Sequence, residues 1–200
     1  MNPTSRFSNI CVFCGSSAGV DDLYARQAAA LGAEIARRGY GLVYGGGNLG
    51  LMGAVSRAAF TGGANVFGII PGPLAAKEIA GETIGRIEVV ETMHQRKARM
   101  AELSDAFVTL PGGIGTLEEL FETISWIQLG IHNKPMGLLN VNGFFDHLLQ
   151  MLHYQIDQGF IPDRYRSLLV VSTEPAELID GLLRHETPAS AIQWISAEQA

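Results

Sequence analysis

The sequence predicts a doubly wound α/β fold, in which a mainly parallel sheet carries helices on both faces. Short apolar runs typical of buried strands alternate along the chain with longer segments whose apolar residues recur at helical spacing. Of the 200 residues, 47% are hydrophobic and 24 are glycines, which suits a large core and many tight turns. Repeated strand–helix units of this length form a parallel sheet covered on both sides. We expect one domain at residues 1–185, followed by a loose tail at residues 186–200.

The first half of the chain begins with an apolar run that predicts a strand at residues 10–13. The helix expected next, at residues 22–38, ends at Gly39, a residue typical of helix ends. The following elements are expected as strands at residues 41–44, 65–70 and 87–90 and as helices at residues 49–61 and 93–103. Residues 74–85 follow a Pro-Gly-Pro turn and predict an irregular or partly helical excursion.

The second half continues the same alternation. Residues 106–110 form a buried run that predicts the fifth strand. The long helix expected after it has an apolar stripe at Leu117, Leu120, Phe121, Ile124 and Ile127. The remaining elements are expected as strands at residues 135–139 and 168–171 and as helices at residues 144–158 and 175–184.

Three turns at the carboxyl edge of the predicted sheet are rich in glycine or serine. They follow the strands at residues 10–13, 41–44 and 106–110. One such turn indicates only a tight bend, but ligands of open α/β sheets bind at this edge, so three together favour a shared site. The possible ligand contacts within these turns are Ser16, Gly45, Gly46 and Gly112.

The most informative turn is Pro-Gly-Gly-Ile-Gly at residues 111–115, which leads from a strand into the long helix. Backbone N–H groups at a helix N-terminus bind anions, and glycine lets a phosphate approach the backbone closely. The carboxylates of Glu118, Glu119 and Glu122 just beyond would repel a phosphate. A ligand that is anionic at one end and becomes cationic at the other suits both features, and a ribosyl 5′-phosphate losing its base is such a ligand.

Other nucleotide sites are disfavoured. Residues 45–50 match G-x-G-x-x-G, but they follow the second strand, and Ile-Ile-Pro-Gly at residues 69–72 stands where an acidic residue would hold a ribose. The chain has no G-x-x-x-x-G-K-[ST] motif. A mononucleotide remains the predicted ligand.

Arg96 is the first candidate for a residue that acts on the ligand. It falls in the middle of the apolar stripe formed by Met93, Met100 and Leu103 on its predicted helix. An arginine there must find an anion or a set of acceptors, so it binds the ligand, pairs with a core carboxylate or snorkels to solvent at the helix end. Lys97 flanks the stripe and could bind the ligand together with Arg96.

Glu119 is the second candidate. Thr116 and Glu119 fit a Thr-x-x-Glu capping box, with Thr116 as the N-cap. Helix capping and catalysis are equally consistent with Glu119 on the sequence alone.

Charge and composition argue against several classes of protein. The net charge of −6 disfavours a general nucleic-acid or anionic-membrane surface. Residues 1–8 show no signal-peptide pattern and no apolar run could span a bilayer, so we expect a cytoplasmic protein. The five histidines lack ligand spacing, and we expect no metal and no cofactor. Cys11 and Cys14 stand in and after a strand, where residues three apart face opposite sides, so both are expected only to pack.

Taken together, these segments resemble the LONELY GUY family of cytokinin riboside 5′-monophosphate phosphoribohydrolases. The matching motifs are V-F-C-G-S-S at residues 12–17, L-V-Y-G-G-G at 42–47, G-L-M-G at 50–53, M-H-Q-R-K at 93–97, P-G-G-I-G-T-L-E-E at 111–119 and Q-L-G-I-H-N-K-P at 128–135. The resemblance extends from about Ile10 to Leu183. The P-G-G-x-G-T-x-x-E element with an upstream Arg-Lys pair is highly specific.

The resemblance implies a Rossmann-like homodimer that hydrolyses the N-glycosidic bond of N6-modified AMP, releasing a free base and ribose 5-phosphate. It implies that Arg96 and Glu119 are catalytic. The further substrate contacts that it implies are Glu78, Lys97, Gly113, Ile114, Gly115, Thr116, Leu117, Glu118 and Ser125. A nucleotide-binding module without turnover is the alternative. Members often carry the label lysine decarboxylase, which implies pyridoxal phosphate, but the sequence gives no independent support for that cofactor.

Trp126 bears on assembly. It lies opposite the apolar stripe of the long helix, on the side of Glu119. Either a neighbouring segment of the same chain or a second subunit covers it. We expect a second subunit, because the family forms dimers and tryptophan is enriched at interfaces.

Overall fold

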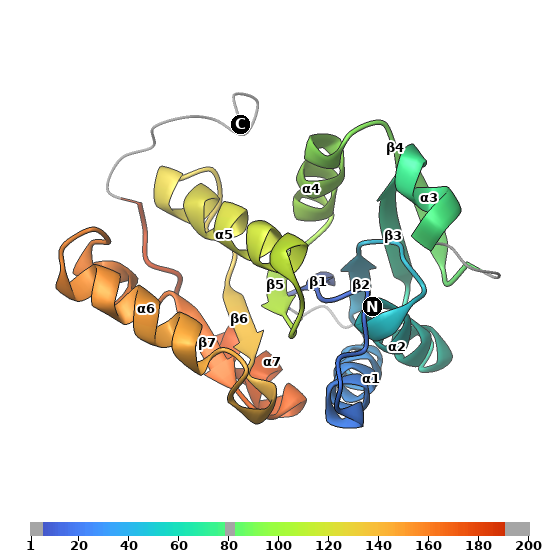
Figure 1. Cartoon of the computed structure of the whole chain (residues 1–200), viewed down its shortest axis with the longest axis horizontal. Coiled ribbons are helices and arrows are strands. Elements are labelled where there is room, and N and C mark those ends of the chain that lie inside the picture. Colours follow the sequence, from blue (N-terminus) through green and yellow to red (C-terminus); the bar gives the residue numbers. More distant parts are fainter. Residues whose placement is uncertain (1–5, 79–82, 191–200) are drawn as a thin grey trace.

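The computed structural model describes residues 6–78 and 83–190, apart from the side chains of residues 76–78. Its sheet has seven strands in the order β4-β3-β2-β1-β5-β6-β7, and every neighbouring pair is parallel (Figure 1). The predicted α/β fold with a mainly parallel sheet is therefore confirmed.

All the predicted strands are present, each to within one residue at either end. They are β1 Asn9–Phe13, β2 Gly41–Tyr44, β3 Val66–Pro71, β4 Arg86–Val90, β5 Ala106–Thr109, β6 Met136–Leu139 and β7 Leu169–Ser172. The helices are α1 Asp22–Arg37, α2 Gly50–Thr61, α3 Gly72–Glu78, α4 Met93–Glu102, α5 Ile114–Leu129, α6 Asp146–Asp157 and α7 Pro175–Arg184, with 3-10 turns at η1 Val141–Gly143 and η2 Asp163–Ser167.

Two segments differ from the predicted secondary structure: one expected excursion contains a helix, and one expected helix starts later. The excursion expected at residues 74–85 opens with α3, which starts directly after β3. Pro73 stands in the first turn of α3, where its missing N–H has no intrahelical partner to lose. The helix expected at residues 144–158 is preceded by η1, in which Asn142 has φ 52°, and α6 itself begins only at Asp146.

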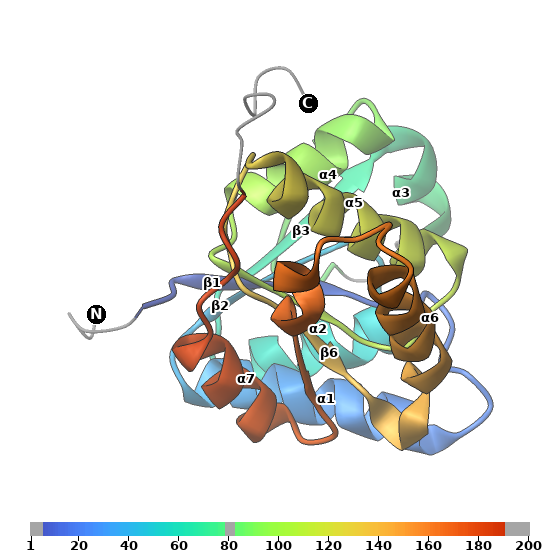
Figure 2. The same ribbon diagram turned by 90° about the vertical axis from the view of Figure 1, so that its left-hand side faces the viewer.

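The helices form one layer on each face of the sheet (Figure 2). Leu31 of α1, Val55 of α2 and Leu178 of α7 share a core with the strand residues of one face. The opposite core includes Met100 of α4 and Ile124 of α5. Residues that alternate along a strand point to opposite faces, which explains why a single buried strand supplies both cores.

The first strand illustrates this alternation at its two cysteines. Cys11 belongs to the core under α4 and α5, whereas Cys14 belongs to the core under α1 and α2. Both are buried free thiols. The expectation that they pack on opposite faces is confirmed.

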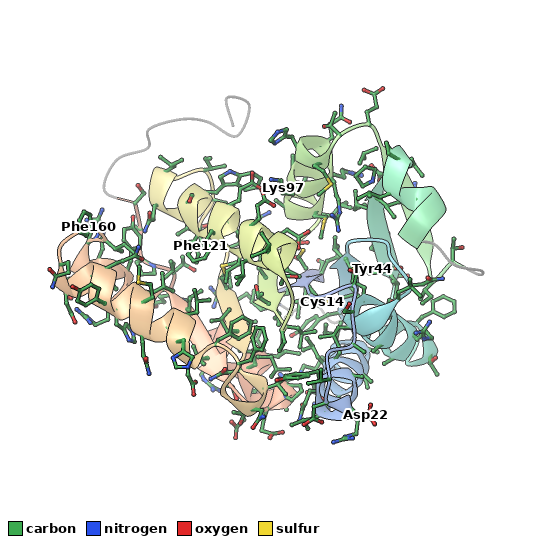
Figure 3. The ribbon with its side chains drawn as sticks, in the orientation of Figure 1. Cys14, Asp22, Tyr44, Lys97, Phe121 and Phe160 are labelled. Atoms are coloured by element: carbon green, nitrogen blue, oxygen red, sulfur yellow. The ribbon has the colours of Figure 1, made fainter. Side chains whose placement is uncertain are left out.

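The apolar stripe of α5 is narrower than expected. Leu120, Ile124 and Ile127 are buried, whereas Phe121 is 39% exposed. The prediction that Phe121 faces the core was wrong, because Phe121 lies at the edge of the stripe and points out of the sheet-facing layer. Figure 3 shows its side chain on α5.

The strand order places a topological switch point beside β1. The chain winds from β1 outward to β4 and then returns to β5 on the other side of β1. The loops after β1 and β5 touch, since the Gly15 N–H donates a hydrogen bond to the Pro111 carbonyl at 3.1 Å. A Cβ on Gly15 would lie only 3.2 Å from the Gly112 Cα. Open α/β sheets bind ligands at this crevice.

The described chain ends beside the C-terminal end of α5. The Ser190 hydroxyl donates to the Gln128 carbonyl at 2.9 Å. Residues 191–200 of the expected tail lie outside the described residues, so the division into residues 1–185 and 186–200 stays a prediction. Within the described ranges, no helix is long and apolar enough to cross a membrane.

Candidate active site

A pocket of about 180 Å³ lies at the carboxyl ends of β1 and β5. Its walls come from the loop after β1, from α2, from α4 and from the N-terminus of α5. The lining residues are Cys14, Gly15, Ser16, Met52, Met93, Arg96, Gly113, Gly115, Thr116, Glu118 and Glu119. Larger pockets lie between α5 and α6, between α4 and α5, on the other side of the loops after β1 and β5, and beside the start of β3, but none of these four is lined by Arg96 or Glu119. We take the smaller pocket as the site because it joins the charged candidates to the helix N-terminus.

The N-terminus of α5 opens directly into this pocket. The helix begins at Ile114 with Gly113 as its N-cap, and no side chain caps it. The backbone N–H groups of its first turn therefore lack intrahelical acceptors. They are available to an anion, and the helix dipole favours negative charge there.

The predicted capping box at Thr116 and Glu119 was wrong. Thr116 lies inside the first turn of α5 rather than before it. Its side chain packs over Gly112, where a Cβ would come within 2.2 Å of the Thr116 hydroxyl. Because Gly113 starts the helix without a side-chain signal, the Thr-x-x-Glu pattern downstream had indicated a later start. Helix capping therefore does not explain why a glutamate stands at position 119.

Two glycines of this turn have open space where a side chain would stand. A Cβ on Gly113 or on Gly115 would meet no atom within 4 Å. Neither packing nor a positive φ therefore requires glycine at these positions. Glycine in a helix is less stable than alanine by about 1 kcal/mol, so its presence at Gly115 favours a ligand that approaches the backbone.

Arg96 is held at the opposite wall of the pocket. A capping box formed by Thr92 and Gln95 starts α4 and places Arg96 just inside the helix. Arg96 is 8% exposed, and its Nε donates to the Ile69 carbonyl at 3.1 Å. One terminal nitrogen lies 3.4 Å from the Gly45 carbonyl, at the end of β2.

Glu119 is the ionic partner of Arg96. The same terminal nitrogen of Arg96 lies 3.4 Å from Glu119 Oε1, and Glu119 is only 7% exposed. Burial raises the pKa of Glu119 to about 7, although the charge of Arg96 acts in the opposite direction. Of the predicted alternatives for Arg96, pairing with a core carboxylate is observed, and that carboxylate itself lines the pocket.

Gly45 and Gly46, in the turn after β2, do not line the pocket. A Cβ on Gly45 would lie 2.0 Å from a guanidinium nitrogen of Arg96. Gly46 has φ +82°, and a Cβ there would lie 2.9 Å from Ile70. Glycine at 45 thus makes room for Arg96, and glycine at 46 allows the backbone turn.

Lys97 is not among the residues that line the pocket, and its side chain reaches across to α5. Its ammonium donates hydrogen bonds to Glu118 and, at 2.9 Å, to Glu122. Figure 3 shows Lys97 on α4, at the side turned to α5.

The other predicted contacts are spread more widely. Ser16 lines the pocket, Ile114 is 83% exposed at its rim, and Leu117 is partly buried in the core. Ser125 is exposed on α5, and its hydroxyl donates to the Phe121 carbonyl at 2.8 Å instead of lining the pocket. The side chain of Glu78 lies outside the described residues.

Sequence reasoning missed four residues at the wall: Cys14, Gly15, Met52 and Met93. Apolar side chains at Cys14, Met52 and Met93 gave no functional signal, and Gly15 indicated only a turn. The Thr-x-x-Gln capping box at Thr92 and Gln95 was also missed, although this pattern could have fixed the start of α4.

Comparisons with known proteins agree with these motifs. A family model described as "Possible lysine decarboxylase" matches residues 52–182. The cytokinin riboside 5′-monophosphate phosphoribohydrolase LOG1 of Arabidopsis thaliana is 50% identical over 198 residues, which cover 97% of this chain and 93% of that protein. The probable phosphoribohydrolase LOGL2 of Oryza sativa subsp. japonica is 50% identical over 95% of this chain and 80% of its own length.

The chain belongs to the LONELY GUY family. Solved structures more distant than these LONELY GUY relatives share the fold. The molybdenum cofactor carrier protein of Chlamydomonas reinhardtii has a TM-score of 0.65 at 23% identity, covering 88% of this chain and 98% of that one. At that identity, the similarity concerns the fold alone.

The LONELY GUY site combines two chemical features in one pocket. An uncapped helix N-terminus with two open glycines offers donors to a phosphate. A buried carboxylate paired with an arginine stands beside it. In the part of the chain that the structure describes, no group of three or more His, Cys, Asp and Glu side chains could hold a metal ion.

Proposed function

We propose that this protein hydrolyses the N-glycosidic bond of adenosine 5′-monophosphates, including N6-modified ones, and releases the free base and ribose 5-phosphate. Curated relatives that are 50% identical over nearly the whole chain are named for this reaction on cytokinin riboside 5′-monophosphates. The observation that carries the proposal is the buried Arg96–Glu119 pair facing the uncapped N-terminus of α5 across one pocket.

The phosphate end of the substrate would bind at α5. The N–H groups after Gly113 donate to phosphate oxygens, and the open space at Gly115 allows the close approach. Ser16 stands on the facing loop and can add a hydroxyl donor. This arrangement fixes the ribose with its C1′ toward the carboxylate side of the pocket.

Glu119 would act at the bond that breaks. The electron pair of the C1′–N9 bond leaves with the base, and positive charge develops on the ribose ring. The Glu119 carboxylate stabilises that charge and accepts a proton from the attacking water, whose oxygen forms the new bond to C1′. One hydrogen of the water stays on the new C1′ hydroxyl. The proton taken up by Glu119 is then released and an equivalent proton reaches the base, so the reaction consumes only water.

Arg96 would hold Glu119 in its reactive position. Its guanidinium is fixed by the carbonyls of Ile69 and Gly45, so the carboxylate faces a rigid cation. This cation opposes the effect of burial on the pKa of Glu119 and keeps a fraction of the carboxylate ionised near neutral pH. Arg96 can also offset the charge of the bound phosphate.

The same geometry does not favour lysine decarboxylation. An amine that forms a Schiff base must lose its proton, which requires a depressed pKa. At Lys97, beside the pocket, burial lowers the pKa, but hydrogen bonds with Glu118 and Glu122 outweigh burial and hold this pKa above its ordinary value. Burial does lower the pKa of Lys134, but that ammonium donates to the Ala101 carbonyl and does not line the pocket. Lysine incubated with the protein and pyridoxal phosphate should give no cadaverine.

A product assay tests the proposed function. AMP, N6-isopentenyl-AMP and adenosine are incubated separately with pure protein, and free base and ribose 5-phosphate are quantified by chromatography. We expect both monophosphates to be cleaved at least about a hundredfold faster than adenosine, since phosphate binding contributes several kcal/mol. Equal rates on AMP and adenosine contradict the phosphate site. Binding of AMP without product formation would favour a non-catalytic nucleotide-binding module.

We also propose a two-fold homodimer in the cytoplasm, where nucleoside monophosphates are present, with no nucleic-acid or membrane partner. Two apolar side chains on α5 are exposed to solvent, namely Ile114 and Phe121. Trp126 is half-buried and makes an edge-to-face contact with His132. Residues of the same chain therefore cover part of its ring. A second subunit placed along α5 would cover Phe121, and Ser125 and Glu122 would then lie close to the partner.

A further inference from the structure

The helix α6 is incompletely covered on the side turned to α5. Of its 12 residues, only Ile156 is buried. Leu149 and Leu152 of α6 are half-buried and line a pocket of about 370 Å³ between α5 and α6. The other walls include Ile124 of α5 and Val171 of β7, which is 41% exposed. An apolar pocket of this size that opens at the surface is typical of a binding site.

One polar atom in the wall of this pocket requires a partner. Tyr165 lines the pocket and is 5% exposed. Its buried hydroxyl has no hydrogen-bond partner within residues 6–78 and 83–190. Buried tyrosine hydroxyls are normally paired. The occupant of the pocket should therefore be mostly apolar and carry a hydrogen-bonding group.

The chain itself follows the rim of this pocket after α7. The His185 side chain lies against the backbone of Leu168, and the Ser190 hydroxyl donates to the Gln128 carbonyl at 2.9 Å (Figure 2). Leu168 and Gln128 both line the pocket. The described chain therefore reaches the rim at η2 and ends at the rim beside α5, with residues 191–200 still to follow.

The sequence of residues 191–200, Ala-Ile-Gln-Trp-Ile-Ser-Ala-Glu-Gln-Ala, has the chemistry that the pocket requires. Ile192, Trp194 and Ile195 are large and apolar, and the indole N–H of Trp194 is a donor. Trp194 is four residues beyond Ser190, so its Cα lies at most about 14 Å from that of Ser190. A second copy of the chain would need to associate to fill the pocket, whereas this segment already starts at the rim.

We propose that residues 191–200 dock in the pocket between α5 and α6 of their own chain, with Trp194 as the anchor. The docked segment covers the apolar side of α6 and joins it to the C-terminal end of α5. This assignment differs from the loose tail predicted from the sequence, and it does not depend on the proposed reaction.

The test measures how strongly acrylamide quenches the fluorescence of Trp194. Trp126→Phe leaves Trp194 as the only tryptophan of the full chain, and circular dichroism checks the folding of every variant. The quenching constant in this protein should be at least about threefold lower than in a free peptide of residues 186–200, because a buried indole is shielded from solvent. Equal quenching in protein and peptide would overturn the proposal, and this comparison requires no change in the pocket.

Substitutions in the same single-tryptophan protein then locate the segment. Leu152→Glu places a charge in the apolar pocket, so Trp194 should become as accessible as in the peptide. Val171→Glu should have the same effect, and it serves if Leu152→Glu does not fold, because Val171 is already partly exposed. Two controls should leave the quenching constant unchanged: Met151→Glu, on the exposed side of α6, and Ala98→Glu, in the pocket between α4 and α5. Protection that survives both pocket substitutions, or that is lost in either control, means that the segment does not dock in this pocket.

A mixture of two proteins separates docking within one chain from docking on a second copy. Leu152→Glu chains that carry Trp194 are refolded together with an excess of tryptophan-free chains that end at Ser190. Trp194 should stay accessible, because its own chain has no usable pocket. Restored protection would show that the segment reaches the pocket of another copy, and docking within the chain would then be rejected.

Discussion

Gly115→Ala should separate stability from activity at the proposed phosphate site. A Cβ at this position meets no atom within 4 Å, and the backbone of Gly115 is helical with no positive φ. Alanine is therefore accommodated without a clash. Replacing glycine by alanine in a helix stabilises a protein by roughly 0.5–1 kcal/mol, because the unfolded chain loses conformational freedom. For a chain of this size, that gain corresponds to a rise in Tm of about 1–4 °C.

The added methyl group should nevertheless impair the reaction. It occupies the open space through which a phosphate oxygen would approach the first N–H groups of α5. We expect KM for AMP to rise at least about tenfold, which corresponds to about 1.4 kcal/mol of lost binding. Thermal unfolding followed by circular dichroism and steady-state kinetics on AMP measure the two effects on one preparation.

Gly72→Ala provides the matched control. Gly72 begins α3 away from the pocket, and a Cβ there would meet only a Val89 methyl at 3.8 Å, an ordinary contact. This variant should leave KM and kcat for AMP unchanged. An unaltered KM in Gly115→Ala would refute the close approach of phosphate to this backbone.

Glu119→Gln keeps the size of the side chain and removes its charge, so AMP turnover measured on folded protein should fall by roughly a hundredfold or more. Since burial raises the pKa of Glu119 from 4.5 to about 7, the folded state keeps a proton that the unfolded chain loses between these pH values. The free energy of unfolding from urea titrations should therefore fall as pH rises from about 4.5 to 7, by at most about 3 kcal/mol, and Glu119→Gln should lack this contribution. Turnover of the natural protein should rise through the same range if the carboxylate is the active form, and a pH-independent rate would contradict that assignment. Gly45→Ala would place a Cβ 2.0 Å from Arg96, so kcat should fall at least about tenfold while circular dichroism remains native; normal activity would show that the guanidinium can shift harmlessly. Light scattering at micromolar concentration should give about twice the 21.5 kDa chain mass, and a monomer with full activity would refute the proposed dimer.

The strands were predictable because their physical signal is local. A buried parallel strand needs a continuous apolar run, and the glycine or proline that ends it is visible in the same few residues. The beginning of α5 was not predictable in this way. Gly113 caps the helix without a side chain, so the later Thr116–Glu119 pattern gave the stronger local indication.

The site depended on information that is not local. The stripe on α4 correctly predicted that Arg96 needs acceptors, but the acceptors lie at the ends of β2 and β3 and on α5. Only the strand order brings these three elements to one edge of the sheet. The burial of Glu119 was missed for a related reason, because a carboxylate outside the apolar stripe of its own helix is normally solvated.

The pairing of Arg96 with Glu119 shows that an ion pair in the core and a role at the ligand do not exclude one another. An arginine bound to a core carboxylate is usually structural, and a buried carboxylate paired with a cation is usually inert. Here the pair has one open side, because Gly113 and Gly115 leave the space beside Glu119 without side chains. The fold stabilises a charge pair that it does not enclose. That combination distinguishes a site able to meet a developing ribosyl cation from a salt bridge that only holds two helices together.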